Sequence, residues 1–288
     1  MSGWRSAAAV IQKTRLFEAV FNGLDLYIQF FCYMRSFGIG RVMRQIKIED
    51  LHVGGLKIYR DTQGFCFGTD AVLLSWFAGL KKARKICDLC TGTGIVAFLL
   101  SHKLPGAEIC GVDILPQSVQ LAQEAARLNG LSQRVTFLQA DVKEIRTVLD
   151  AGRCDLVCVN PPYWSVGSGA AARAEDQKAA RMEFSCTFDD VAAAAAFLLK
   201  QGGRFCLIHR AERMVDVLAC MRRFGLEPKE LCMIVPKQGA APKLFLCEGK
   251  KGGAAGLKIV PNLVLYDDDG TESAQLRQIY GKEPVESE

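Results

Sequence analysis

The chain has 288 residues, of which 50% are hydrophobic and 23% charged. This composition excludes a disordered or fibrous protein and is typical of a globular enzyme with its own core. The longest apolar stretch, residues 16–34, is interrupted by Glu18 and Asp25, so we expect neither a membrane span nor a clean signal peptide.

The twelve cysteines stand mostly within apolar runs rather than in a loop-rich framework. This pattern predicts reduced, buried thiols in a reducing compartment, and we expect a cytoplasmic protein. Cys87 and Cys90 form a CxxC pair. Neither a second pair nor a histidine follows at zinc-ligand spacing, so we expect no metal site and no redox role for this pair.

The net charge of +5 is unevenly distributed. Residues 266–288 carry −5 and are expected to form an acidic C-terminal tail, which leaves +10 on residues 1–265. A modestly basic body tolerates a polyanion, although charge alone favours the ordinary interpretation, a solvated surface with a slight excess of lysine and arginine. Residues 1–42 are an extension of unknown role. Met43 stands just before the first predicted strand, so we expect residues 1–42 to be dispensable.

Residues 43–84 are expected to form a hairpin and a helix that pack on a larger domain. Residues 48–58, with Gly54-Gly55 at the turn, predict the hairpin, and residues 70–80 predict a helix capped by Thr69 or Asp70. From residue 85, short apolar runs alternate with helical patterns. The predicted strands are 85–89, 108–112, 135–138, 155–159, 203–209, 231–235 and 244–248, and the predicted helices are 95–103, 117–128, 142–149, 189–200 and 212–224.

This alternation predicts an α/β domain over residues 85–265, with helices on both faces of a mostly parallel sheet. The last two strands are joined by residues 236–243 only. This link is too short for a crossover, so the two strands should pair antiparallel. A seven-stranded Rossmann-like sheet that ends in an antiparallel hairpin is typical of class I methyltransferases and differs from dinucleotide dehydrogenases.

A glycine-containing loop, Asp88-Leu-Cys-Thr-Gly-Thr-Gly94, follows the first strand of this domain and opens a helix. Glycines permit a tight turn and close approach to a ligand, and the helix N-terminus supplies free amides. The candidate cofactor-binding residues are Asp88, Thr91, Gly92 and Gly94. The loop alone fits a nicotinamide dinucleotide as well as S-adenosylmethionine.

Two acids at the ends of the next strands extend this candidate site. Asp113 stands where a carboxylate can bind both ribose hydroxyls of either cofactor. Asp141 could accept a hydrogen bond from the adenine amino group, and an acid there is expected for S-adenosylmethionine but is not required for a dinucleotide. Both residues also precede helices, so helix capping is the alternative role for each.

The tetrapeptide Asn160-Pro161-Pro162-Tyr163 directly follows the fourth strand. An exocyclic amine on an aromatic ring is a poor nucleophile, because its lone pair is delocalised. The side-chain oxygen of Asn160 and the carbonyl of Pro161 can accept from its two hydrogens and favour the pyramidal form. The prolines fix the backbone, and Tyr163 offers a face on which a planar substrate can stack. This loop predicts methylation of an amino nitrogen through orientation and electrostatic complementarity.

The chain resembles the class I amino-methyltransferases with an Asn-Pro-Pro-Tyr/Phe motif, and within them the tRNA(Val) adenine-37 N6-methyltransferase family. The resemblance runs from about residue 48 to about residue 280. Its motifs are FCFGTDAVLL at 65–74, DLCTGTG at 88–94, NPPY at 160–163, VGSG at 166–169, RFCLIHRAER at 204–213 and GLKIVP at 256–261. It implies that Gly68 and Thr69 help to position S-adenosylmethionine and that the Asn160–Tyr163 loop holds adenine.

The expected function is N6-methylation of a tRNA adenine, with adenosine 37 as the implied target. The alternatives are N5-methylation of a protein glutamine, guanine-N2 methylation of RNA, and a non-catalytic RNA-binding module with a relict cofactor pocket. The tentative tRNA contacts are Trp164, Arg181 and Arg210. In the family a histidine often follows the arginine at the position of Arg181, where this chain has Met182. Further candidate RNA contacts are Lys237, Lys243, Lys250 and Lys251, and nothing indicates an obligate protein partner.

Overall fold

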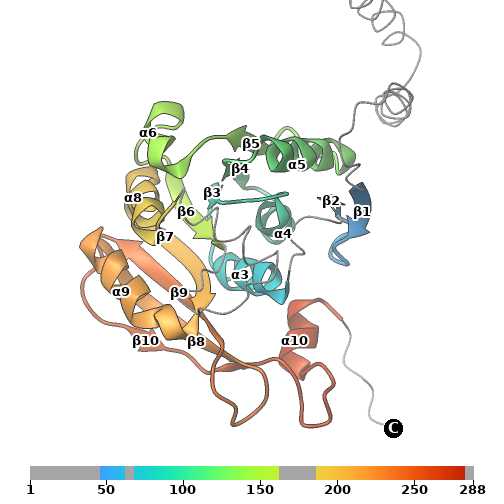
Figure 1. The fold of residues 1–288 in the computed structure, drawn as a ribbon, viewed down its shortest axis with the longest axis vertical. Helices are drawn as coiled ribbons and strands as arrows, with labels where there is room; N and C mark the ends of the chain where they lie inside the picture. The colour runs from blue at the N-terminus through green and yellow to red at the C-terminus, as the bar shows by residue number, and fades with distance from the viewer. Residues whose placement is uncertain (1–45, 62–67, 162–185, 283–288) are drawn as a thin grey trace, which may run out of the picture. The chain divides into compact units, whose positions relative to one another are not determined.

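A computed structural model describes residues 46–61, 68–161 and 186–282 (Figure 1). Its main feature is a nine-stranded sheet with the order β10-β8-β9-β7-β6-β3-β4-β5, and β11 also pairs with β8. The strands of this sheet are β3 (Lys85–Leu89), β4 (Glu108–Asp113), β5 (Val135–Gln139), β6 (Cys154–Val159), β7 (Leu199–Arg210), β8 (Leu226–Val235), β9 (Leu244–Lys251), β10 (Lys258–Ile259) and β11 (Leu263–Val264).

The helices of the described residues alternate with these strands. They are α3 (Thr69–Gly79), α4 (Ile95–Lys103), α5 (Pro116–Leu128), α6 (Ile145–Val148), α8 (Phe188–Leu198), α9 (Met214–Arg223) and α10 (Ala274–Ile279). Two 3-10 turns, η1 (Val142–Glu144) and η2 (Ala211–Arg213), precede α6 and α9. No helix among these described segments is long and apolar enough to cross a membrane.

The sheet has the predicted topology. Strands β5, β4, β3, β6 and β7 run parallel, and β9 lies antiparallel between β7 and β8. The seven predicted strands and the antiparallel pairing are therefore confirmed. Strands β10 and β11 add to the β8 edge, and each has only two residues, too few for a sequence pattern to reveal.

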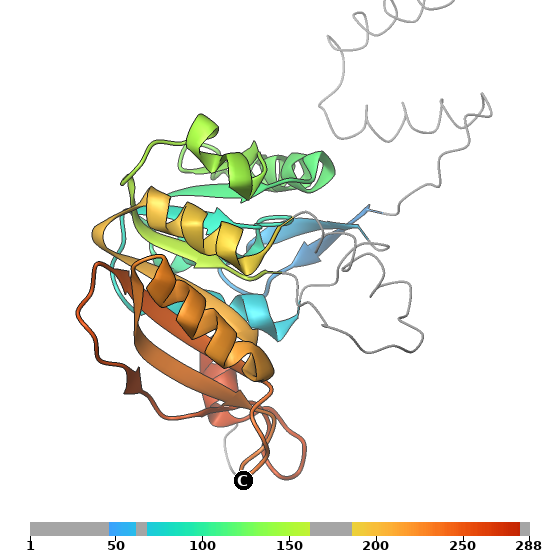
Figure 2. The same cartoon turned by 60° about the vertical axis from the view of Figure 1, so that its left-hand side comes forward.

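Helices cover both faces of this sheet (Figure 2). One apolar cluster contains the buried faces of α3, α4 and α5, and a second contains those of α6, α8 and α9. Helix α4 is apolar along most of its length, and Ile95 to Ser101 are all buried, as expected for a helix enclosed by neighbours. Helix α5 instead buries one side, including Val119 and Ala122, and leaves the other side to solvent.

The predicted hairpin is present as β1 (Ile46–Asp50) and β2 (Lys57–Asp61), which pair antiparallel. Gly54 and Gly55 both have positive φ at its turn, which glycine adopts without strain. Asn129 fixes the hairpin to the C-terminus of α5. Its side chain accepts from the backbone N–H of Lys57 at 2.9 Å and donates to the Lys57 carbonyl at 2.6 Å.

Two details differ from the sequence-based expectations. Helix α3 begins at Thr69 with Gly68 at the N-cap position and without a side-chain capping bond, so neither Thr69 nor Asp70 caps it. The acidic C-terminal segment is not a free tail up to residue 282. Ser273 caps α10 by accepting from the backbone N–H of Leu276, and Leu276 and Ile279 are buried. The negative charge of this segment hid the short amphipathic helix within it.

Candidate functional site

The carboxyl ends of the parallel strands bring most of the described candidate residues to one edge of the sheet. Val159 of β6 and Val112 of β4 both pair with Leu89 of β3. The loop after β3 therefore lies between Asp113 on one side and Asn160 on the other, and neighbouring strands are about 4.8 Å apart. Open α/β sheets bind their ligands at this edge.

The glycine loop has a conformation that few other residues could adopt. Gly92 and Gly94 have φ values of 56° and 89°. A Cβ on Gly94 would lie 2.6 Å from the ring of Phe137, whereas a Cβ on Gly92 would meet nothing within 4 Å. Gly92 thus leaves open space beside the N-terminus of α4. Cys90 shares the left-handed conformation, with φ 56°, which the sequence does not reveal.

Asp88 is buried at the end of β3, with 1% of its surface exposed. It accepts a hydrogen bond from the Thr91 hydroxyl. Burial raises the pKa of its carboxyl group from 3.8 to about 7, even though the Thr91 hydroxyl and the Ala97 backbone N–H favour the anion. A cationic ligand beside this carboxylate would compensate for its lost solvation.

Asp113 organises the backbone around the glycine loop. Its two carboxylate oxygens accept from the backbone N–H groups of Gly92 at 2.8 Å and Leu115 at 2.9 Å. Each oxygen retains a further lone pair that can accept from a hydroxyl. The next residues, Ile114 and Leu115, expose 38% and 41% of their surface. Ile114 and Leu115 were not among the site residues predicted from the sequence. Their position directly after an acid at a strand end is the signal that could have identified them.

Asp141 lies two strands away from the glycine loop, beyond β5. It caps η1 by accepting from the Lys143 backbone N–H at 2.9 Å, and its other oxygen pairs with the Lys143 ammonium at 3.6 Å. The capping role considered from the sequence is therefore present. The first three strand ends carry the predicted glycine loop and two acids in the predicted order.

Asn160 has an unpaired acceptor in the described structure. Its side-chain oxygen is buried and has no hydrogen-bond partner, although buried acceptors are nearly always paired. Pro161, which follows it, is also buried. A donor from a ligand would satisfy this oxygen. Pro162, Tyr163, Trp164 and Arg181 lie outside the described residues.

The end of β7 supplies a further residue beside this position. His209 is buried, and its Nδ1 accepts from the backbone N–H of Arg210 at 2.9 Å. Burial, together with the charge of Arg213, lowers the pKa of this imidazole to about 4, so it is neutral at physiological pH. Arg210 itself pairs with Glu212 at 3.5 Å. The sequence predicted Arg210 as a tRNA contact but did not single out its buried neighbour, His209.

Helix α3 directs Gly68 and Thr69 toward the same edge. Its C-terminal end is held away from that edge, where Arg204 in the middle of β7 donates to the carbonyls of Ala78 and Lys81. An eleven-residue helix spans about 16 Å, so its first residues reach the carboxyl side of the sheet. The positions of Gly68 and Thr69 are compatible with the role that the resemblance implies.

The four candidate lysines separate into two groups. Lys237 and Lys243 lie on the turn between β8 and β9, where the Lys243 carbonyl accepts from the Ala211 backbone N–H at the end of β7. This is the edge of the candidate site. Lys250 and Lys251 lie at the other end of β9, and Lys250 pairs with Arg204 in the sheet. The second pair therefore lies at the opposite edge.

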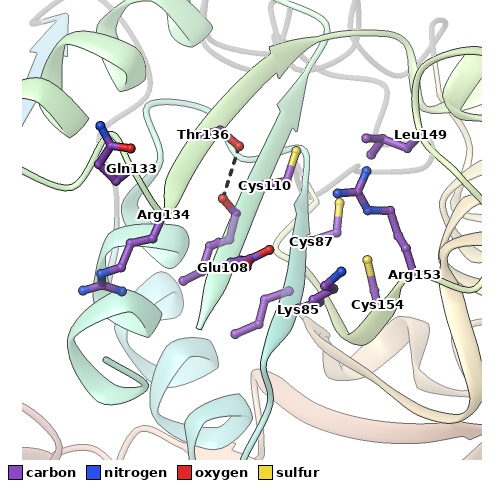
Figure 3. Close-up of a pocket in the computed structure, with 12 residues that line it drawn as sticks. Lys85, Cys87, Glu108, Cys110, Gln133, Arg134, Thr136, Leu149, Arg153 and Cys154 are labelled. Atoms are coloured by element: carbon purple, nitrogen blue, oxygen red, sulfur yellow. Dashed lines mark hydrogen bonds between the residues drawn. The ribbon is translucent and has the colours of Figure 1, made fainter. Parts of the chain in front are cut away.

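A small pocket is also present at that opposite edge (Figure 3). It has a volume of about 120 Å³, and its lining includes Lys85, Glu108 and Cys154, the first residues of β3, β4 and β6. None of the predicted site residues lines it. It lies at the amino ends of the strands, away from the Asn160 loop and the glycine loop.

Comparisons with known proteins agree with this geometry. A family model described as "Methyltransferase domain" matches residues 80–238. The chain is similar to the tRNA1(Val) (adenine(37)-N6)-methyltransferase of Actinobacillus pleuropneumoniae serotype 7, with 29% identity over 73% of this chain and 86% of the relative. It is 28% identical to the enzyme of that name from Porphyromonas gingivalis strain W83, over 65% of this chain and 75% of the relative.

Solved structures show the same fold. A predicted O-methyltransferase from Agrobacterium tumefaciens superimposes with a TM-score of 0.60 and 22% identity, covering 74% of this chain and 95% of that chain. TYW2 from P. horikoshii, solved in complex with MeSAdo, gives a TM-score of 0.51 and 13% identity, covering 74% of each chain.

S-adenosylmethionine fits the residues at this edge. It is an amino acid with a cationic ammonium group, and Asp88 is a buried carboxyl group with no cationic partner among the described residues. The open space at Gly92 suits the close approach of the amino-acid portion of the cofactor. The carboxylate of Asp113 has remaining lone pairs that suit the ribose hydroxyls. The family model covers more than half of the chain, so the chain belongs to the methyltransferase domain family, and its cofactor is S-adenosylmethionine.

Proposed function

We propose that this enzyme methylates the N6 amino group of an adenine in tRNA, with adenosine 37 of the anticodon loop as the favoured target. Two observations support the proposal. The curated relatives from A. pleuropneumoniae and P. gingivalis bear the name of that activity. The buried Asn160 oxygen at the end of β6 needs a donor, and an exocyclic amine can provide one. The unpaired oxygen is the structural observation that carries the proposal.

Bound S-adenosylmethionine supplies an electrophilic methyl group on a sulfonium centre. The enzyme's own contribution is to orient the amine that receives it. In this proposal the Asn160 oxygen and the Pro161 carbonyl accept from the two amine hydrogens and turn the nitrogen lone pair toward the methyl group. Such preorganised acceptors stabilise charge that develops during the reaction. The amine loses its extra proton afterwards, so no general base is required before transfer.

The proposed cofactor contacts follow the order of the strand ends. Asp88 pairs with the ammonium group, with Thr91, Gly92 and Gly94 shaping the loop beside it. Asp113 accepts from the ribose hydroxyls. Asp141 accepts from the adenine amine, and this role requires it to share its carboxylate with Lys143. Gly68 and Thr69 close the site from α3. Ile114 and Leu115 present exposed apolar surface beside Asp113 and suit the flat face of the cofactor's adenine.

The remaining assignments concern the tRNA. Pro162 keeps the loop rigid and Tyr163 stacks on the target base, which must leave the anticodon loop stack to be reached. Trp164 extends the stacking surface, and Arg181 and Arg210 contact phosphates. The tRNA substrate and the free cysteines of the described residues support a cytoplasmic location for the proposed activity.

Label transfer tests the proposal directly. The enzyme is incubated with methyl-labelled S-adenosylmethionine and either total tRNA or total protein, and the labelled tRNA is digested to nucleosides. We expect label in tRNA as N6-methyladenosine, and tRNA that lacks adenosine 37 should remain unlabelled. Label in protein as N5-methylglutamine, or in RNA as N2-methylguanosine, would contradict the proposal and identify the alternative substrate. The Asn160→Ala variant controls for contaminating activity.

A further inference from the structure

The pocket at the amino edge of the sheet is separate from the candidate active site. It lies where β3, β4, β5 and β6 begin, and its volume is about 120 Å³. Side chains from these strands and from the turns before them surround it (Figure 3). One water occupies roughly 30 Å³ in the liquid. The pocket can therefore hold a small ligand of several heavy atoms rather than a single solvent molecule.

Cationic side chains dominate the charge of this lining. Lys85, Arg134 and Arg153 line the pocket together with a single acid, Glu108. Arg134 holds the wall, because its Nη2 donates to the Ser101 carbonyl at 3.0 Å. Lys85 and Arg153 are exposed, and neither forms an ion pair with a residue in the described segments. Two unpaired cations around one cavity repel each other, and an anion between them would offset this repulsion.

The acids near the pocket leave these two cations without a partner. Glu108 lies opposite Lys85 in the β3–β4 register, but its carboxylate makes no ion pair within the described part of the chain. Asp155 pairs instead with Lys200, which does not line the pocket. Asp155 also accepts from the backbone N–H groups of Arg84 and Lys85 at 2.8 and 2.9 Å. Although burial opposes ionisation, these contacts lower the pKa of Asp155 to about 2, so its charge is already balanced.

Three thiols form the inner wall of the pocket. Cys87 and Cys154 are buried, and Cys110 is partly exposed. Burial raises the pKa of Cys154 to about 12, against the opposing charges of Arg153 and Lys85, so this thiol stays neutral and does not repel an anion. The described residues contain no group of three His, Cys, Asp or Glu side chains that could hold a metal ion. The pocket therefore suits an anion rather than a metal.

We propose that this pocket binds the phosphate group of a ligand, with Lys85 and Arg153 as its two charged contacts. A tetrahedral phosphate group fits the available volume. The guanidinium of Arg153 offers paired N–H donors that match two phosphate oxygens, and the Lys85 ammonium group contributes a point charge. Inorganic phosphate, pyrophosphate and the 5′ phosphate of an RNA share this chemistry.

The surroundings of the pocket favour a ligand with more than one phosphate group. Lys82 and Arg84 are exposed on the turn that connects α3 to β3 and leads directly to Lys85. Exposed charges act over roughly 8 Å at physiological ionic strength, so neighbouring residues of one turn act together. A second phosphate group outside the pocket would meet this positive charge. We therefore expect pyrophosphate to bind more tightly than inorganic phosphate, and both to bind more weakly as salt is added.

The experiment uses the full-length enzyme in a buffer without phosphate. Calorimetric titration with pyrophosphate should show one site, and Lys85→Gln and Arg153→Gln should each weaken binding by about tenfold. Lys258→Gln removes an exposed lysine of β10 and is the matched control, which should bind pyrophosphate like the parent. The affinity for S-adenosylmethionine should be unchanged in all three variants, because the two sites lie at opposite edges of the sheet. This second titration also shows that the variants are folded.

A competition titration identifies the source of the phosphate group. Pyrophosphate binding that tRNA leaves unchanged assigns the pocket to a small ligand. Displacement by tRNA with a 5′ phosphate, but not by dephosphorylated tRNA, assigns it to the end of an RNA. Absence of pyrophosphate binding, or equal binding by the parent, Lys85→Gln and Arg153→Gln, would overturn the proposal. Displacement of pyrophosphate by S-adenosylmethionine would also overturn it, because the anion would then occupy the cofactor site. None of these measurements depends on methylation of tRNA.

Discussion

The unpaired oxygen of Asn160 makes stability and activity depend differently on this residue. A buried acceptor without a hydrogen-bond partner lowers the free energy of unfolding by about 1–3 kcal/mol. The Asn160 side-chain oxygen has no such partner in the described structure. Asn160→Ala removes that cost, so the cofactor-free variant should unfold at the parent temperature or above it. In the proposed mechanism the same change removes an acceptor that acts as the target nitrogen becomes pyramidal. Single-turnover methylation should slow by ~10²–10³.

Two measurements make the Asn160 prediction specific. Calorimetric affinity for S-adenosylmethionine should be unchanged in Asn160→Ala, because the loss falls on the chemical step. Asn160→Asp keeps an acceptor and should retain partial activity. If Tyr163 stacks on the target base as proposed, Tyr163→Ala should instead raise the Michaelis constant for tRNA, because such stacking would hold the base before reaction as well as during it. Methylation by Asn160→Ala at the parent rate would remove this residue from the mechanism.

Asp88 links cofactor binding to pH. Burial raises its pKa from 3.8 to about 7 in the cofactor-free enzyme, so the folded state holds a proton that the unfolded chain releases at lower pH. The stabilisation from this proton is complete below the ordinary pKa and is lost as the pH rises through about 7. An ammonium group beside Asp88 favours the carboxylate. Cofactor binding at about pH 6 should therefore release close to one proton.

Titration calorimetry in buffers of different ionisation enthalpy measures that proton. Asp88→Asn should release none at this pH and should bind the cofactor more weakly. Without its cofactor, the same variant should be more stable than the parent above about pH 7, because it has no buried carboxylate to ionise. Equal proton release by parent and variant would show that a group other than Asp88 loses the proton when the cofactor binds.

At the scale of single elements, sequence pattern succeeded where an element is long and failed where it is short. The apolar run at 95–103 and the one-sided pattern at 117–128 fixed α4 and α5 almost to the residue. Strands β10 and β11, with two residues each, carry no periodicity. Helix α10 was obscured by the surrounding acids, and the predicted helix at 142–149 is divided into η1 and α6. These features depend on tertiary contacts that local pattern does not contain.

The anchoring of α3 gives a prediction at this scale. Arg204 donates to the Ala78 and Lys81 carbonyls at the end of the helix, and it pairs with buried Glu248 at 2.9 Å. Removing one partner of a buried ion pair leaves an uncompensated charge. Glu248→Gln should lower the free energy of unfolding by on the order of 3 kcal/mol, measured by urea denaturation.

Lys200→Gln is the matched control for Glu248→Gln. The Lys200–Asp155 pair is more exposed, with 56% of the lysine side chain accessible. Exposed pairs contribute at most about 1 kcal/mol, so this variant should remain close to the parent. Equal losses in the two variants would mean that burial of the Arg204–Glu248 pair does not determine its contribution.

For the whole molecule, the order of motifs along the chain was enough to predict that the candidate site residues lie at one edge of the sheet. In a parallel sheet all carboxyl ends share one side, so Asp88, Asp113 and Asn160 had to gather there once their strands were identified. The distribution of surface charge was not predictable in this way. The four candidate lysines lie close together in the sequence, but Lys243 precedes β9 and Lys250 lies near the end of that strand, so the two are held at opposite edges. The sequence also could not reveal that both carboxylate oxygens of Asp113 accept hydrogen bonds from backbone N–H groups.

This separation of the lysines predicts which of them the tRNA contacts. Lys243 and Lys250 are both exposed, and they lie on the same strand or its preceding turn. Only Lys243 lies beside the site. A charge that neutralises a phosphate releases counterions, and its loss lowers the slope of log affinity against log salt by about 0.9. Lys243→Glu should therefore weaken tRNA binding and reduce this slope, whereas Lys250→Glu should bind like the parent. Filter binding over a salt series measures both quantities, and cofactor titration should be unchanged in each variant. If Lys250→Glu were the weaker binder, the tRNA would have to extend across the amino edge of the sheet.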